Sequence, residues 1–247
     1  MKPDDLIRAA YDLFAPYTIG RTLEVCKCCV SDAEERELVQ TPLRAVSRDL
    51  LQRAYYESAR GYSAQELWEM KHFLPRVLEL VSGFEFPCHS TEITFTRLDL
   101  HQPTGWTAPE RALLDAFALA FFEQCLGRYP LPGDEPLSNL LLMFGLGRFD
   151  LAPLLRAWAA ADSRASTLHF TDFLLHEAIF AANQRVRLRN AFSEPFVNEA
   201  VAAWLHDETV QDGFAQRLES CLLSNPALDE ATVRDLSGAH DLLRALT

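Results

Sequence analysis

Three of the six cysteines in this chain fall within four consecutive positions, at Cys26, Cys28 and Cys29. A structural zinc ion takes four Cys or His ligands in a tetrahedral array, and two of them commonly come from a loop with Cys-x-x-Cys spacing. Cys26 and Cys29 have this spacing, and the adjacent residues Cys88 and His89 supply two further ligands. The sequence therefore predicts a candidate zinc site that joins the N-terminal region to a later connector.

Two other uses of these cysteines are compatible with the sequence. The segment Ser31-Asp-Ala-Glu34 is predicted to start a helix, and the positive end of a helix dipole lowers the pKa of a nearby thiol. Lys27 would act in the same direction, so a thiol redox site is one alternative. The other alternative is that the cysteines are small apolar side chains at a junction between helices.

A second group of residues with metal-binding side chains is His169, Asp172 and His176. Steps of three and four residues place two imidazoles and a carboxylate on one face of a helix, and such a set suits a metal ion with open coordination positions. Phe173 and Phe180 fall on nearly the same face, so the histidines could equally be core residues hydrogen-bonded through Asp172. Both interpretations stay open at the level of the sequence.

The sequence contains no common catalytic motif. His176-Glu177 does not complete the zinc-protease motif, because Phe180 stands where the second histidine is required. Gly145-Leu-Gly147 lacks the third glycine of a dinucleotide-binding loop and follows an apolar run that is predicted to be helical. Phosphate loops, nucleophile elbows and kinase signatures do not occur. An enzyme of a common class is therefore disfavoured.

The candidate residues lie on or between predicted helices. Three segments match the capping box that starts a helix, at Ser31, Ser63 and Thr107. The apolar spacing is helical after these starts, and Pro75 is predicted to kink or split the helix that follows Ser63. Further helices are predicted at 137–145, 151–161, 166–182, 195–206, 208–223 and 230–245.

These elements predict an all-α fold. The strand-like alternation from Glu92 to Arg97 has no second run to pair with, so 84–105 is interpreted as a connector with a short helix or extended piece. We expect one helical domain over 1–247, with 84–105 as the single candidate boundary between 1–83 and 106–247. Helices of about 10 to 20 residues with short connectors favour an irregular multi-helix array, of which HEAT-like stacked pairs are one form.

The formal net charge of -12 argues against nucleic acid as a partner, because phosphate contacts need clustered Lys and Arg. The densest basic run, Arg185-Val-Arg187-Leu-Arg189, is interpreted as a solvated helix end. The N-terminus does not have the pattern of a signal peptide, and no apolar run is long enough to span a membrane. We therefore expect no membrane association and a cytoplasmic location with free thiols.

The chain resembles a group of uncharacterised bacterial proteins that carry a Cys-x-Cys-Cys cluster near the N-terminus. The similar stretches are Cys26–Ser31, Lys71–Leu80, Trp106–Glu110, Asp150–Trp158 and Leu168–Asp172. The resemblance implies an all-helical fold and a bacterial source. It implies no activity, substrate or catalytic residue, because none is assigned to that group.

The leading functional hypothesis is a helical scaffold or adaptor that binds a protein partner. Trp106, beside Gly105 in the connector, is the candidate anchor for that partner, because aromatic side chains dominate binding hot spots. The alternative is a metal- or thiol-dependent enzyme that uses the cysteine cluster or the His169, Asp172 and His176 set. Zinc is the cofactor that this alternative would favour.

Overall fold

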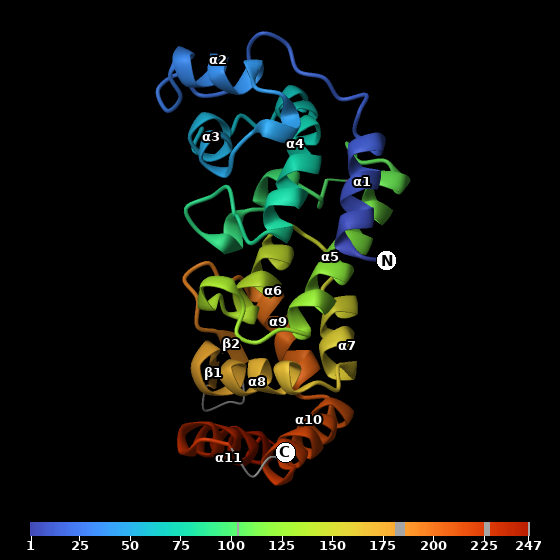
Figure 1. Cartoon of the computed structure of the whole chain (residues 1–247), viewed down its shortest axis with the longest axis vertical. Coiled ribbons are helices and arrows are strands. Elements are labelled where there is room, and N and C mark those ends of the chain that lie inside the picture. The colour runs from blue at the N-terminus through green and yellow to red at the C-terminus, as the bar shows by residue number, and fades with distance from the viewer. Residues whose placement is uncertain (103, 181–185, 225–227, 247) are drawn as a thin grey trace. The chain divides into compact units, whose positions relative to one another are not determined.

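The computed structural model describes residues 1–102, 104–180, 186–224 and 228–246. Helices dominate this part of the chain, and its strands form one two-stranded sheet (Figure 1). The predicted all-α class is confirmed, and the HEAT-like stacking stays a prediction. The chain divides into two compact units, unit 1 with Met1–Phe121 and Gly147–Phe149, and unit 2 with Phe122–Leu146 and Asp150–Thr247.

Unit 1 is built from helices and short helical turns. They are α1 (Pro3–Leu13), α2 (Asp32–Gln40), η1 (Leu43–Ala45), α3 (Arg48–Leu51), η2 (Gln52–Tyr56), α4 (Ala64–Ser82), η3 (Thr91–Ile93), η4 (Thr96–Leu98) and the larger part of α5 (Ala108–Leu126). Helix α1 lies alongside α4, as Figure 1 shows. The division between the units falls within α5, whereas the connector 84–105 lies inside unit 1.

The predicted helix starts are confirmed by their hydrogen bonds. The capping boxes at Ser31 and Thr107 are complete, with reciprocal bonds between each cap and the glutamate three residues later. At the third start, the Ser63 hydroxyl accepts from the Glu66 amide. Helix α4 continues through Pro75 without a break, so the predicted split does not occur. Its neighbours in the helix are buried, and this packing outweighs the loss of one backbone hydrogen bond.

The carboxylate of Glu66 is the centre of a buried hydrogen-bond network in unit 1. Glu66 is only 3% exposed. It accepts from the amides of Gly61 and Tyr62 at 3.0 and 2.7 Å, and from the guanidinium groups of Arg60 and Arg97 at 3.1 and 2.7 Å. A buried carboxylate with this many charge-assisted donors is fully satisfied, so it fixes the loop before α4 to the helix itself.

A second buried ion pair joins α4 to α5. The ammonium of Lys71 donates to the Glu110 carboxylate at 2.8 Å, and both residues are almost fully buried. The hydroxyl of Tyr17 donates to the other carboxylate oxygen at 2.5 Å. The same ammonium lies 4.6 Å from the ring of Trp106, a cation–π contact. The positive charge is therefore held by one carboxylate and an aromatic face.

Unit 2 contains the rest of α5 and the elements that follow it. They are η5 (Pro132–Asp134), α6 (Leu137–Leu146), α7 (Ala152–Ala160), α8 (Arg164–Asp172), η6 (Phe173–Glu177), β1 (Ala178–Phe180), β2 (Val186–Leu188), α9 (Pro195–Leu205), α10 (Glu208–Leu223) and α11 (Glu230–Arg244). Trp158 is fully buried at the centre of this unit. The rings of Phe170, Phe173, Trp204 and Phe214 surround it.

The predicted helix over 166–182 is confirmed as helical to Glu177 and is wrong from Ala178 to Phe180, while 181 and 182 lie outside the described residues. Helix α8 ends at Asp172, η6 continues it as a π-helical turn to Glu177, and β1 follows at once. Strand β1 pairs with β2 in an antiparallel hairpin. The run that contains Arg187 is therefore a strand and not a helix end, while Arg185 lies outside the described residues. Pairing between strands decides this region, and it is not visible in the local pattern of a single segment.

We expect Lys71→Met to lower the free energy of unfolding by about 3 to 5 kcal/mol, because it leaves the Glu110 carboxylate buried without its cation. The double variant Lys71→Met, Glu110→Gln should be more stable than this single variant. Arg53→Ala breaks an exposed pair with Glu37 and should cost less than about 1 kcal/mol. Urea unfolding measures all three variants, and equal losses for Lys71→Met and Arg53→Ala would contradict the expectation.

Candidate functional site

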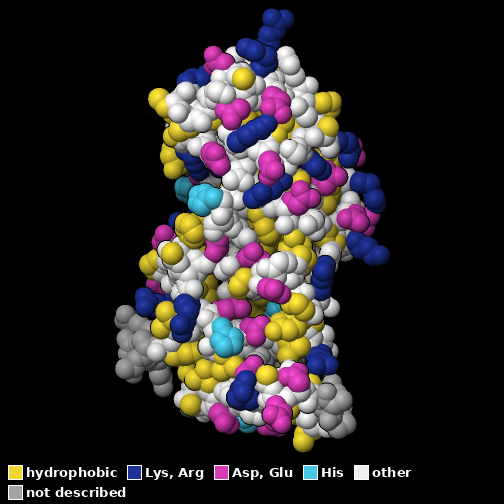
Figure 2. Space-filling model, turned by 60° about the vertical axis from the view of Figure 1, so that its left-hand side comes forward, with side chains coloured by type: hydrophobic (Ala, Val, Ile, Leu, Met, Phe, Trp, Pro, Cys, Tyr) yellow, Lys and Arg dark blue, Asp and Glu magenta, His cyan; other side chains and the backbone are white. Residues whose placement is uncertain are grey.

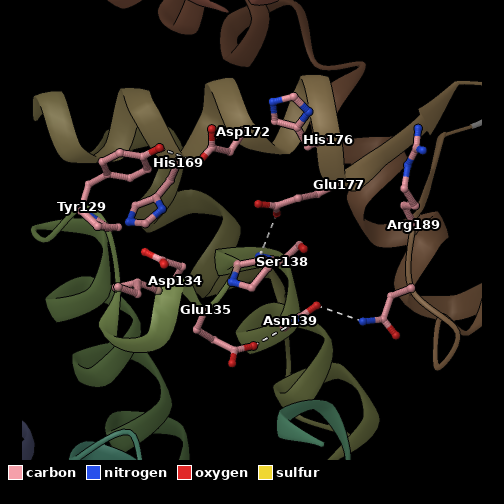
Figure 3. Close-up of a pocket in the computed structure, with 14 residues that line it drawn as sticks. Tyr129, Asp134, Glu135, Ser138, Asn139, His169, Asp172, His176, Glu177 and Arg189 are labelled. Carbon is pink, nitrogen blue, oxygen red and sulfur yellow. Dashed lines mark hydrogen bonds between the residues drawn. The ribbon is translucent and has the colours of Figure 1, made fainter. Parts of the chain in front are cut away.

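Unit 2 contains a pocket of about 470 Å³ that is rich in carboxyl groups (Figure 3). Its polar lining residues are Tyr129, Asp134, Glu135, Ser138, Asn139, His169, Asp172, His176, Glu177, Arg189 and Asn190. We call this site the acidic pocket, because its lining, among the residues that the structure describes, has four carboxyl groups and a single guanidinium group. Figure 2 shows acidic side chains beside a histidine on the surface of this unit.

The π-helical turn η6 brings Asp172 and Glu177 to the same pocket. The amide of Ala178 donates to the carbonyl of Phe173, five residues earlier, which is the hydrogen bond of a π-helix. Positions five apart in an α-helix differ by about 140° around the helix axis. The wider turn reduces this angle, so two carboxylates from one helical segment both line the pocket.

The hairpin supplies a further wall of the pocket, at the side where Arg189 lies (Figure 3). Strand β2 ends at Leu188, and the next amide, that of Arg189, donates to the carbonyl of Glu177 at 2.6 Å. Asn190 follows, and its side-chain amide donates to Asn139 of α6 at 2.9 Å. The strand that replaces the predicted helix end therefore places Arg189 and Asn190 at the pocket.

Among the acidic side chains of the pocket, Glu177 has the pKa that is shifted furthest from its ordinary value. Its half-buried carboxylate accepts from the amide of Ser138 at 3.3 Å (Figure 3). Burial, together with the carboxylates of Asp172 and Glu135, raises the pKa of Glu177 to about 7, and hydrogen bonding by Ser138 opposes this shift. Burial and two neighbouring carboxylates therefore both disfavour the charged form of Glu177.

Tyr129 and His169 form the edge of the pocket next to Asp172. The Tyr129 hydroxyl donates to Asp172 at 2.7 Å, and the Tyr129 ring lies edge-on to the imidazole of His169. The His169 Nε2 atom lies 2.7 Å from the carbonyl oxygen of Arg128. Burial lowers the pKa of His169, so its imidazole is neutral and donates to this carbonyl at pH 7. Tyr129 remains 38% exposed at the rim.

The structure brings the predicted His169, Asp172 and His176 set to one pocket. His169 and Asp172 are already bonded to Arg128 and Tyr129, while His176 is exposed. In the part of the chain that the structure describes, no group of three or more His, Cys, Asp or Glu side chains is arranged to hold a metal ion. Metal binding by this set therefore stays a prediction that the side-chain arrangement does not support.

The side-chain arrangement in unit 1 does not support the predicted zinc site either, and that site also stays a prediction. Cys28 and Cys29 are exposed, whereas Cys88 is buried and burial raises the pKa of its thiol to about 12. A zinc ligand must be a thiolate, so this environment opposes metal binding at Cys88. The described residues, which include His89, contain no cluster of three or more His, Cys, Asp or Glu side chains that could hold a metal ion.

The cysteines near the N-terminus share one turn. The amides of Cys29 and Val30 both donate to the carbonyl of Cys26 at 2.9 Å. Lys27, expected to assist a thiolate, instead pairs with the carboxylates of Glu35 and Asp32. The three thiols therefore lie together without a neighbouring cation from this lysine.

Trp106, the predicted partner anchor, is half-buried. Its indole N–H donates to the carbonyl of Leu98 at 2.9 Å, and its ring contacts Lys71 and Phe14. These contacts occupy its polar atom and part of its ring within unit 1. Binding of a partner at Trp106 stays a prediction.

Sequence reasoning missed Tyr129, Asp134, Glu135, Glu177 and Arg189 as members of the site. The adjacent acids at 134 and 135 carry no local signal that relates them to η6, because three helices, α6, α7 and α8, separate them from it in the sequence. The pocket depends on a π-turn and a hairpin, and neither has a pattern that distinguishes it from a continuing helix.

We expect Glu177→Gln to stabilise the protein at pH 8 and to have little effect at pH 5. The folded state holds the Glu177 proton with a pKa of about 7 against an ordinary value of 4.5, so wild-type stability falls as the pH rises through this interval. The neutral glutamine avoids the loss, and we expect a gain of about 1 to 3 kcal/mol at pH 8.

Thermal unfolding at the two pH values measures this difference. Glu199→Gln, at an exposed position of α9, is the matched control. Its change in Tm should be the same at pH 5 and at pH 8. A Glu177→Gln variant with the same change in Tm at pH 5 and pH 8 would show that the carboxyl titrates normally.

Comparison with protein-family models, curated protein sequences and solved structures finds no match to this chain. None of the helices in the described residues has the length and apolar character needed to cross a membrane. The function of the chain must therefore be inferred from its own side chains, and the acidic pocket and the cysteine turn are the places where those side chains gather.

Proposed function

We propose that this protein is an adaptor that binds a protein partner, and that the acidic pocket receives a Lys or Arg side chain of that partner. The main support is the surplus of carboxyl groups around Glu177, whose pKa is raised to about 7 by burial and by Asp172 and Glu135. A cationic group in the pocket would relieve this repulsion. It would also lower the pKa of Glu177 and release its proton.

The pocket has the other features that a basic side chain needs. Its volume of about 470 Å³ accommodates a single long side chain. The exposed ring of Tyr129 at the rim offers a face for a cation–π contact. Among the described lining residues, Arg189 brings one positive charge against four carboxyl groups, and this balance favours a cation over an anion.

The charge of the whole chain acts in the same direction. A formal net charge of -12 attracts basic partners over long range and increases the rate of encounter at low salt. The proposal places the adaptor in the cytoplasm, in keeping with free cysteines at all six positions. The bacterial source implied by the resemblance remains part of this proposal.

The test uses short peptides and NMR spectroscopy of the full chain. Acetyl-Gly-Arg-Gly-amide is compared with the same peptide carrying citrulline, which has a similar shape and no charge. We expect the arginine peptide alone to shift the amide signals of Ser138, Asn139 and Asn190, with a dissociation constant on the order of millimolar. Binding should strengthen between pH 6 and pH 8, as Glu177 becomes ionised.

Two variants separate the pocket from general electrostatic attraction. Glu177→Gln should abolish the pH dependence and weaken binding, whereas Glu199→Gln, which removes the same charge from an exposed position of α9, should change neither. Equal binding of the citrulline peptide, or shifts spread over the acidic surface, would overturn the proposal.

A further inference from the structure

The cysteine turn, which we define as Cys26 to Cys29, has the backbone geometry of a turn that can close a disulfide. The Cys29 amide donates to the Cys26 carbonyl at 2.9 Å, the hydrogen bond of a β-turn between its first and fourth residues. The Cα atoms at these two positions of a β-turn lie within about 7 Å, and a disulfide spans about 4.4 to 6.8 Å.

The neighbouring groups of the turn also act on the Cys26 thiol. The Cys28 amide, as the largest cause, and the Cys29 thiol both lower its pKa. Backbone N–H groups and thiols that point to one sulfur stabilise its thiolate, and they lower the pKa of Cys26. The β-turn hydrogen bond joins Cys26 and Cys29, so Cys29 is the thiol that the turn brings back toward Cys26.

Both ends of the turn are held in place while its thiols stay accessible. At one end, the Cys26 amide donates to the hydroxyl of the buried Ser58 at 2.7 Å. At the other end, Val30 is 1% exposed and anchored in the core. Cys28 and Cys29 are exposed and Cys26 is half-buried. A rigid turn therefore presents three thiols to solvent.

We propose that the cysteine turn is a thiol–disulfide exchange site, with Cys26 as the attacking thiol and Cys29 as the resolving thiol. The substrate class is a disulfide-bearing molecule, either a small disulfide such as oxidised glutathione or an exposed disulfide of a protein. This activity is independent of the acidic pocket, which lies in unit 2.

The exchange proceeds in two balanced steps. The Cys26 thiolate attacks one sulfur of the substrate disulfide, a Cys26–substrate S–S bond forms, the substrate S–S bond breaks, and the other substrate sulfur leaves as a thiolate. Cys29 then loses its proton to solvent and attacks the Cys26 sulfur, which releases the second substrate thiolate. The protein dithiol is oxidised by two electrons, and the substrate disulfide is reduced to two thiols.

The other cysteines differ in their surroundings. Cys88 and Cys125 are buried, and burial raises the pKa of each thiol to about 12. Thiols in such a state are poor nucleophiles at neutral pH. These two buried thiols should stay unmodified by a reagent that reaches only the cysteine turn, and they therefore serve as internal controls.

The experiment treats the fully reduced full-length protein with oxidised glutathione at pH 7, without metal or oxygen, and maps the products by mass spectrometry. The wild-type protein should form a Cys26–Cys29 disulfide that dithiothreitol reverses. Cys29→Ser should stop at a glutathione mixed disulfide on Cys26, and Cys26→Ser should lose both products. Cys28→Ser is the matched control from the same turn and should retain the wild-type disulfide.

Circular dichroism of each variant establishes that helicity is unchanged, so that a lost product reports on chemistry and not on folding. Glutathione distributed equally over the three thiols would overturn the proposal. A bond between Cys28 and Cys29 would overturn it too, as would loss of the disulfide in Cys28→Ser or an unreactive wild-type protein. Unaltered peptide binding in the acidic pocket would accompany any of these results, because the two sites do not share residues.

Discussion

The burial of the Glu66 carboxylate is the constraint on which much of unit 1 depends. A buried carboxylate is tolerated only when donors satisfy it, and here they come from the loop before α4, from Arg60 and from Arg97 in η4. Arg97 also donates to the carbonyls of Tyr56 and Ser58, and the Ser58 hydroxyl holds the amide of Cys26. The exposed cysteine turn is thus connected by three successive contacts to a charge in the interior.

The two functional regions use electrostatics in opposite ways. In unit 1, four donors match the acceptor capacity of the Glu66 carboxylate, and the result is a fully satisfied network. In unit 2, Ser138 is the donor to Glu177 among the described residues, and Glu177 faces the negative charges of Asp172 and Glu135. A carboxyl group whose charged form is disfavoured gains free energy from a cationic ligand, whereas a satisfied network gains none. This difference is why the pocket, and not the larger ion network, is assigned to binding.

Local signals in the sequence predicted most of the helices and few of the site residues. Capping boxes such as Ser31 to Glu34 act within one turn of the chain, so the helix start is readable there. The end of α8 was not readable, because Phe173 to Glu177 continues the helical pattern and only pairing of β1 with β2 ends it. His169, Asp172 and His176 were identified by their spacing, but Asp134, Glu135 and Arg189 reach the same pocket from other segments.

The π-helical turn η6 also predicts a difference in length between related sequences. A π-turn is equivalent to an α-helix into which one residue has been inserted. Removal of one residue between Phe173 and Glu177 would restore the α-helical ladder and rotate the following side chain by about 100° around the axis. Among relatives of this chain, a gap of one position in this segment would therefore mark proteins in which the carboxyl group no longer faces the pocket, even where the glutamate itself is retained.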